Sequence, residues 1–274
     1  MISVSKKNIE KFKKEGIYKS KKLNIRSFKV YGDGALGSRG AVLKSPYCDD
    51  PHNYGILRTS AKDLKFYAKE IAEMGFQMNT HAIGDSTVSV LLNEYKKILK
   101  DIDDPRWRIE HSQVVDINEF ELYNEKILPS IQPTHATSDM YWAYDRLGSR
   151  IKGAYAFKDL LNSSSRVALG TDFPVEKVNP FHTFYSSVER KDLNGYPENG
   201  FQMENSLTRE ETLKGMTIWG AYFNFEEHEK GSLEVGKSAD FIVLNQNIME
   251  VEADLIPNTE VIQTYIDGEL VYSK

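Results

Sequence analysis

The chain has 274 residues, of which 40% are hydrophobic and 27% are charged, a mix typical of a soluble globular protein. Its net charge of −5 and the lack of a dominant basic patch argue against a nucleic-acid partner. The first 25 residues are rich in lysine and contain no apolar core, so we expect neither a signal peptide nor a membrane span there. The basic run Lys19, Lys21 and Lys22 is expected to be a solvated lead-in. Cys48 is the only cysteine, which excludes an internal disulfide and favours a cytoplasmic location.

Short apolar runs alternate with amphipathic helical patterns along most of the chain. This alternation predicts βαβ units and therefore a parallel sheet covered by helices. Asn179 before Pro180, and the capping box of Thr208 with Glu211, predict the starts of two further helices. Strands are expected at 24–31, 76–82, 107–111, 127–133 and 167–171, and helices at 60–74, 85–100, 116–126 and 156–162.

The sequence pattern changes after about residue 230. A turn-rich stretch leads to a predicted strand at 239–244, and a predicted hairpin at 261–272 turns at Asp267 and Gly268. We therefore expect two parts, an α/β domain at residues 1–230 and a small β-strand module at residues 231–274.

Several predicted strands end in a residue that can bind a metal or move a proton. These residues are His81, His111, His135 and Asp172, and Lys29 lies near the end of the first strand. The carboxyl ends of parallel barrel strands meet on one face, where active sites form. Imidazoles and a carboxylate suit a divalent metal such as zinc, which lowers the pKa of its bound water toward about 7.

Each of these residues also has a plain structural interpretation. A lone histidine is more often a hydrogen-bonded core residue, an aspartate after Gly-Thr is often a turn residue, and a lone lysine is usually solvated. The recurrence of His81, His111 and Asp172 at equivalent places on successive strands favours a shared site over coincidence.

At these residues the chain resembles the amidohydrolase superfamily, in its amidohydrolase-3 or YtcJ-like branch. The resemblance implies a TIM-type (β/α) barrel with a small C-terminal β module, and it runs from about residue 25 to the end. Six stretches carry it in the order of the family: 29–39, 80–85, 108–113, 132–139, 170–175 and 231–244.

The resemblance implies a metal site. His81 and His111 would be ligands from the fifth and sixth barrel strands. Asp172, from the eighth strand, would bind the metal or its water and act as general base. Lys29 matches a fourth-strand lysine that is carboxylated in the family and bridges metals, which would turn a cation into an oxygen ligand.

The resemblance also implies a reaction, the hydrolysis of an amide or related C–N bond in a small molecule by a metal-activated water. Arg39 and His135 match positions that face substrate, and His135 would hold the developing oxyanion. Zinc is the expected metal.

The chain departs from the family in one respect, because the His-x-His of the first barrel strand is missing from the sequence. The first three strand–helix units are expected to be missing too, which leaves a partial barrel of about five. We expect such a chain to self-associate or to pair with a separate N-terminal half. The alternative to an enzyme is an inactive or split-gene fragment that serves as an assembly subunit, or as a metal- or small-molecule-binding module.

Overall fold

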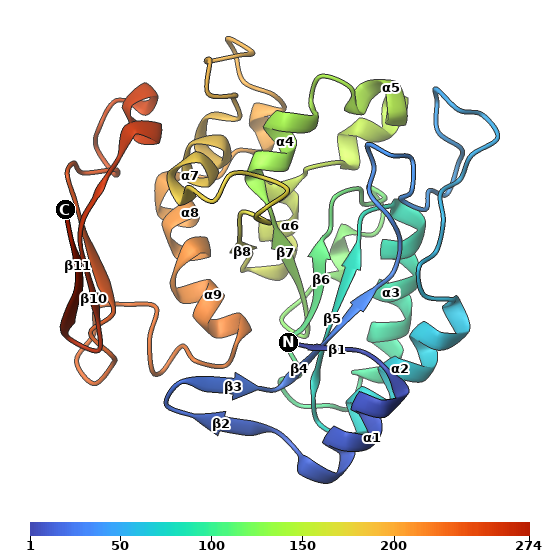
Figure 1. Ribbon diagram of the computed structural model, residues 1–274. Helices are drawn as coiled ribbons and strands as arrows, with labels where there is room; N and C mark the ends of the chain where they lie inside the picture. Colours follow the sequence, from blue (N-terminus) through green and yellow to red (C-terminus); the bar gives the residue numbers. More distant parts are fainter. The chain divides into compact units, whose positions relative to one another are not determined.

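The structure is a computed structural model that describes residues 1–274. The chain divides into two compact units, and each is described by itself. Unit 1 consists of Met1–Ser130 and Tyr141–Ser165, and unit 2 consists of Ile131–Met140 and Arg166–Lys274. Figure 1 shows the elements with their labels.

Unit 1 is built on a parallel sheet with the strand order β1, β4, β5, β6 and β7. The strands are β1 (Ile2–Ser3), β4 (Ser27–Tyr31), β5 (Gln77–Ala82), β6 (Trp107–His111) and β7 (Ile127–Ile131). In unit 2, which includes Ile131, β8 (Ala168–Leu169) continues this order, and the Gly170 amide donates to the Ile131 carbonyl over 3.0 Å. The predicted α/β fold with a parallel sheet is confirmed.

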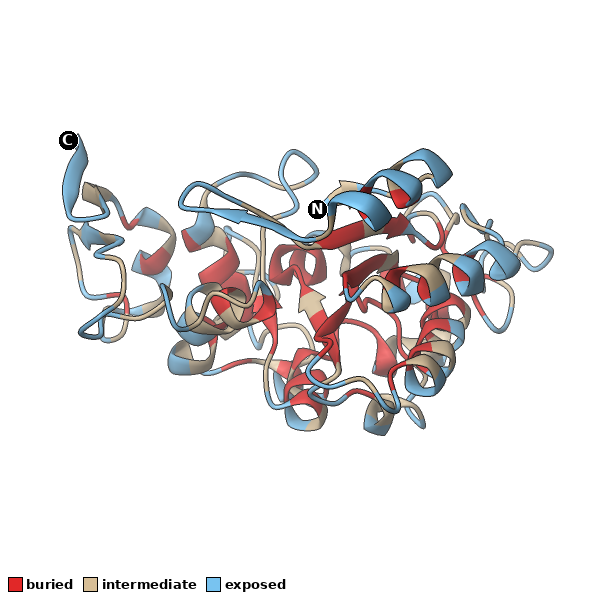
Figure 2. Cartoon of the chain, turned by 90° about the horizontal axis from the view of Figure 1, so that it is seen from below, coloured by how far each residue is buried: buried red, intermediate tan, exposed pale blue.

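Helices cover one face of the unit 1 sheet with apolar side chains. From the strands come Phe28, Val30 and Met78, each with no exposed surface, and from α2 come Leu64 and Ile71. Figure 2 shows the buried residues gathered in the strands and on one side of the helices. The helices of unit 1 are α1 (Lys6–Glu15), α2 (Ala61–Glu73), α3 (Asp85–Ile98), α5 (Ala143–Leu147) and α6 (Phe157–Ser164), with 3-10 turns η1 (Phe120–Leu122) and η2 (Gly148–Gly153).

The first 15 residues are part of the fold, and the basic run Lys19, Lys21 and Lys22 that follows is exposed, as expected. Strand β1 pairs with β4, and helix α1 begins after the N-cap Ser5. Although α1 is rich in lysine, it buries Ile9 and Phe12, which are one turn apart on the same side. The Phe12 ring lies 6.1 Å from that of Phe28. The chain therefore has six parallel strands rather than about five, and only the hairpin of β2 (Tyr18–Ser20) and β3 (Leu23–Ile25) is largely exposed.

The other face of the unit 1 sheet is polar. Strand alternation places Lys29 of β4 beside Asn79 of β5, and Asn79 beside Arg108 of β6. Asn79 has no exposed surface, and Arg108 and Glu110 are 8% and 7% exposed. Arg108 Nε lies 2.9 Å from Glu110 Oε1, so the two buried charges compensate each other.

Two predicted elements differ in the structure. The helix expected at 116–126 is reduced to the 3-10 turn η1, because Asp116 and Asn124 accept hydrogen bonds from nearby backbone amides and compete with a helix. The strand expected at 127–133 ends at Ile131. Pro133 occupies the first position of helix α4 (Pro133–Asp139), where its missing N–H costs nothing.

Unit 2 packs helices around a small apolar cluster. Phe181, Phe184 and Tyr185 from α7 pack with Ile248 and Ile256. The helices are α4, α7 (Pro180–Glu189), α8 (Arg209–Met216) and α9 (Ile218–Phe223), with 3-10 turns η3 (Met203–Asn205) and η4 (Ala253–Asn258). The predicted caps of α7 and α8 are confirmed, including the reciprocal hydrogen bonds of Thr208 and Glu211.

The predicted small β module is an antiparallel sheet with the strand order β11, β10, β9. Its strands are β9 (Phe241–Leu244), β10 (Val261–Ile266) and β11 (Glu269–Ser273), and the hairpin turns at Asp267 and Gly268 as expected. The domain boundary at residue 230 stays a prediction. None of the helices has the length and apolar character needed to cross a bilayer.

Candidate functional site

Two predicted metal ligands lie at the ends of neighbouring parallel strands in unit 1. His81 is the next-to-last residue of β5, and His111 is the last residue of β6. The register places Ala82 opposite His111, so both histidines are at the carboxyl end of the sheet. Their ring centroids are 4.5 Å apart with an interplanar angle of 72°. The fold therefore brings together two imidazoles, a donor type that suits zinc.

The backbone at His111 is unusual. His111 has a φ of 74° and Ser112 a φ of 45°, in the left-handed region that costs a residue with a Cβ about 1–3 kcal/mol. Two hydrogen bonds hold this turn, from Ser112 Oγ to the Ile109 carbonyl over 3.0 Å and from the Tyr123 hydroxyl to Ser112 Oγ over 2.8 Å. Such backbone strain clusters at functional sites.

Lys29 lies on β4 in the same unit. Its Nζ is 5.4 Å from the centroid of the Tyr31 ring, and that ring is 5.8 Å from the ring of His81. Burial would raise the pKa of Glu110, but the charges of Arg108 and Lys29 outweigh burial and hold it below its usual value. Lys29 thus contributes a positive charge to the polar face of the sheet.

Asp33 belongs to this site and was not among the predicted residues. Its carboxylate accepts hydrogen bonds from the amides of Ile83 (3.0 Å), Gly84 (2.9 Å) and Val42 (2.9 Å). Its Oδ1 also lies 3.7 Å from His81 Nε2. Burial outweighs these hydrogen bonds and raises the pKa of Asp33. An acidic residue between Gly32 and Gly34, directly after a strand, is the signal that could have found it.

Arg39 is paired within unit 1. Its Nε and Nη2 donate to the two oxygens of Asp49 over 3.1 and 2.9 Å, and Arg146 donates to the same carboxylate. These hydrogen bonds lower the pKa of Asp49, and the one from Arg39 has the largest effect. Arg39 has a φ of 55° and a side chain that is 32% exposed. Two guanidinium groups share one carboxylate here, which leaves one positive charge in excess.

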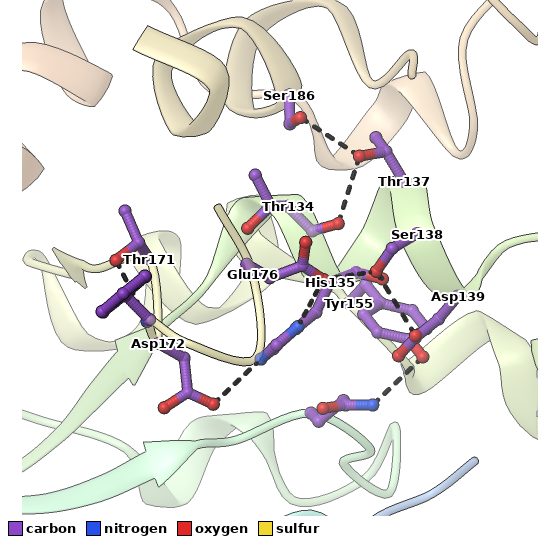
Figure 3. A network of polar contacts seen from close by, with 12 residues as sticks. Thr134, His135, Thr137, Ser138, Asp139, Tyr155, Thr171, Asp172, Glu176 and Ser186 are labelled. Carbon is purple, nitrogen blue, oxygen red and sulfur yellow. Dashed lines mark hydrogen bonds and ion pairs between the residues drawn. The ribbon is translucent and has the colours of Figure 1, made fainter. Parts of the chain in front are cut away.

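The remaining two predicted residues, His135 and Asp172, meet in unit 2. His135 lies in the first turn of α4, and its Nε2 is 3.3 Å from Asp172 Oδ2. Its Nδ1 is 3.1 Å from Oε1 of Glu176, a residue that the sequence analysis missed. Figure 3 shows the ring held between the two carboxylates. Asp172 itself has a φ of 57°.

The electrostatics of this group favour a charged imidazole. Burial by itself would lower the pKa of His135, but the hydrogen bonds to Asp172 and Glu176 outweigh it and raise the pKa to about 9. Burial raises the pKa of Glu176, yet hydrogen bonds from His135 and Ser138 bring it below its usual value. Near neutral pH, His135 is therefore a cation that donates from both ring nitrogens.

The predicted residues thus form one group in each compact unit. Lys29, His81 and His111 lie on neighbouring strands of unit 1, and His135 and Asp172 are in contact in unit 2. Arg39 is also in unit 1 but is bound to Asp49. No sequence motif marked Glu176, because its partner His135 is 41 residues away.

Comparison with known proteins gives consistent matches. The sequence model described as amidohydrolase family matches residues 1–272. Protein LONG AFTER FAR-RED 3 of Arabidopsis thaliana is 31% identical over 263 residues, which cover 94% of this chain and 45% of that protein. The YtcJ protein of Bacillus subtilis strain 168 is 32% identical over 252 residues, which cover 90% of this chain and 47% of that protein. The chain spans about half the length of these curated relatives.

Two solved structures that resemble this chain are consistent with the family match. A metal-dependent hydrolase from Pyrococcus horikoshii OT3 has a TM-score of 0.78 and 27% identity, over 90% of this chain and 50% of that chain. A metal-dependent hydrolase from Pyrococcus furiosus has a TM-score of 0.74 and 28% identity, over 85% of this chain and 47% of that chain.

Proposed function

The chain belongs to the amidohydrolase family, and on that premise we propose that it is part of a metal-dependent hydrolase of amide or related C–N bonds. The observation that carries the proposal is the contact between the His81 and His111 rings at the carboxyl ends of neighbouring parallel strands. Parallel barrels build their active sites on that face.

The residues present fit a divalent metal. His81 and His111 offer two imidazoles, His111 on a strained backbone, and Asp172 adds a carboxylate. We assign these three as ligands and favour zinc, since this donor set suits it. When bound, such a metal acidifies a coordinated water and polarises a carbonyl. Lys29 could contribute only as a carbamate, because an ammonium repels a metal cation, and its carboxylation is part of the proposal.

The other groups would move protons and hold substrate. Asp172 would take a proton from the attacking water and pass it to the leaving nitrogen. His135, as a cation, would donate its Nε2 proton toward the oxygen that gains negative charge. The excess positive charge at Arg39, Asp49 and Arg146 supports a role of Arg39 in binding substrate.

We further propose that the active form includes a second chain, either another copy or a separate N-terminal half. Strand β1 is at the edge of the sheet in unit 1 and pairs only with β4. A free parallel edge invites pairing. We also propose a cytoplasmic location, because a chain with a single cysteine forms no internal disulfide and suits a reducing compartment.

A second candidate function is an assembly subunit without turnover of its own. The observation in its favour is that the sequence has no His-x-His, which the resemblance places on the first barrel strand. Retention of Asp172 and of the His81–His111 contact speaks for the enzyme.

One experiment separates the two functions. The purified chain is assayed after loading with zinc, manganese or cobalt against a panel of N-formyl, N-acyl and cyclic amides. The assay is repeated after adding the N-terminal half of a family member. Metal-dependent hydrolysis in either arm supports the enzyme. Metal binding without turnover in both arms would favour the assembly subunit over the enzyme.

A further inference from the structure

The His135 ring in unit 2 is held at both of its nitrogens. Nδ1 lies 3.1 Å from Glu176 Oε1, and Nε2 lies 3.3 Å from Asp172 Oδ2. We propose that Glu176 is a positioning residue that fixes His135 so that Nε2 is directed at Asp172 (Figure 3). The inference rests on the proposed function, in which Asp172 and His135 act on substrate.

Both carboxylates come from one short turn. The Val175 amide donates to the Asp172 carbonyl over 2.9 Å, and the Phe173 amide donates to Thr171 Oγ1 over 3.2 Å. This turn presents Asp172 and Glu176, four residues apart, to opposite sides of a ring that comes from another element, α4. The direction of the ring therefore depends on the turn as well as on α4.

Glu176 is itself held in place. Ser138, one helical turn after His135 on α4, lies with its Oγ 2.6 Å from Glu176 Oε1. Helix α4 is tied to α7 by the contact of Thr137 Oγ1 with Ser186 Oγ over 3.1 Å. A group that orients a catalytic histidine must have a fixed position of its own, and Ser138 supplies that restraint.

An ordinary surface ion pair does not account for this arrangement. The side chains of His135 and Glu176 are only 10% and 18% exposed, so both have given up water for each other. Burial and the nearby charge of Asp172 both disfavour a charged Glu176, yet the hydrogen bonds from His135 and Ser138 keep its pKa below the usual value. Two carboxylates that flank one ring repel each other and lower the stability of the fold unless the ring between them is a cation. Such local conflicts are expected at functional sites.

Glu176→Ala should lower kcat about 10–100-fold, as is typical when a partner that orients a histidine is removed, with little change in KM. Glu176→Gln keeps an oxygen acceptor for Nδ1 and should restore part of kcat. Lys177→Ala, at an exposed neighbouring position, is the matched control and should behave as wild type. Thermal melts of all variants should agree, which separates positioning from loss of the fold.

A second readout works on the chain alone. The ring nitrogens of His135 are observed by ¹⁵N NMR at one fixed pH, and the signal is assigned by its loss in His135→Gln. Glu176→Ala should shift the Nδ1 signal, and Lys177→Ala should not.

The outcomes are distinguishable. An unchanged Nδ1 signal in Glu176→Ala, or wild-type kcat in an active preparation, overturns the positioning role and leaves the proposed function standing. Absence of turnover in every preparation counts against the proposed function. The Nδ1 signal then shows, without an activity assay, whether Glu176 positions the His135 ring.

Discussion

His81 Nε2 lies 3.7 Å from Asp33 Oδ1, and the same carboxylate accepts hydrogen bonds from three backbone amides. Two of these amides, Ile83 and Gly84, directly follow the strand that carries His81, and the third belongs to Val42. One buried side chain thus joins the loop after β4 to the end of β5. The position of a predicted metal ligand depends on this junction.

Asp33→Asn should destabilise the protein by about 2–4 kcal/mol. The amide would turn an NH₂ group toward backbone N–H donors, and buried donors without an acceptor cost about 1–3 kcal/mol each. The free energy of unfolding is measured by urea denaturation. Asp103→Asn, at an exposed position, is the control and should change stability by less than about 0.5 kcal/mol. Equal stability of the two variants would show that Asp33 does not hold the junction.

Metal should copurify with the chain at less than one equivalent and should be lost from the double variant His81→Ala plus His111→Ala. The reason is that these two imidazoles are in direct ring contact at the carboxyl ends of neighbouring strands. Elemental analysis by mass spectrometry measures the content of zinc and other divalent ions. His228→Ala, whose side chain is 91% exposed, should keep the wild-type content. The same metal content in the double variant and the wild type would refute the site assignment.

Asp172→Asn should reduce turnover by the roughly 10²–10⁴-fold that general acid–base groups contribute. The amide keeps the shape of the side chain but cannot take a proton from water. Steady-state assays of an active preparation, alone or complemented with an N-terminal half, measure kcat. A variant with near-normal turnover would assign the base to another residue, and Glu176 would be tested next.

Phe12→Ala should destabilise the chain by about 3 kcal/mol, the lower end for a buried phenylalanine. Phe12 packs against Phe28 and Phe76, with ring centroids 6.1 Å away in both cases, and so fastens α1 to the sheet. Phe66→Ala, at a residue that is 42% exposed, is the matched control. Urea denaturation of both variants provides the measurement. If Phe12→Ala and Phe66→Ala lower the free energy of unfolding by the same small amount, α1 is not part of the stable core.

The chain alone should self-associate and hydrolyse amides poorly. Strand β1 is at the edge of the sheet in unit 1, and apolar side chains such as Leu233 and Val235 in unit 2 are exposed. Sedimentation velocity gives the size distribution, and adding a family N-terminal half should shift it toward one defined complex. A compact monomer that hydrolyses amides unaided would contradict the need for a partner.

Local patterns in the sequence were enough to predict most of the framework. The alternation of apolar runs and amphipathic stretches predicted β4 to β6, α2 and α3, because strand and helix periodicity depend on neighbours within a few residues. The same patterns placed His81 and His111 at strand ends. The strand expected at 127–133 was too long, because Pro133 starts a helix. Helix α1 was not predicted, because its apolar residues Ile9 and Phe12 stand among many lysines.

Only the tertiary structure decided which side chains meet. Asp33 accepts from amides up to 51 residues away, and Glu176 reaches His135 across 41 residues. Arg39 fits a substrate-facing position by its motif, yet the fold places it on Asp49 together with Arg146, which is 97 residues from that aspartate. Periodicity determines which face of a strand or helix a residue occupies. The partner of a buried charge is determined by how distant elements pack, because such a charge must find a counter-charge or hydrogen-bond partner wherever the chain brings one within reach.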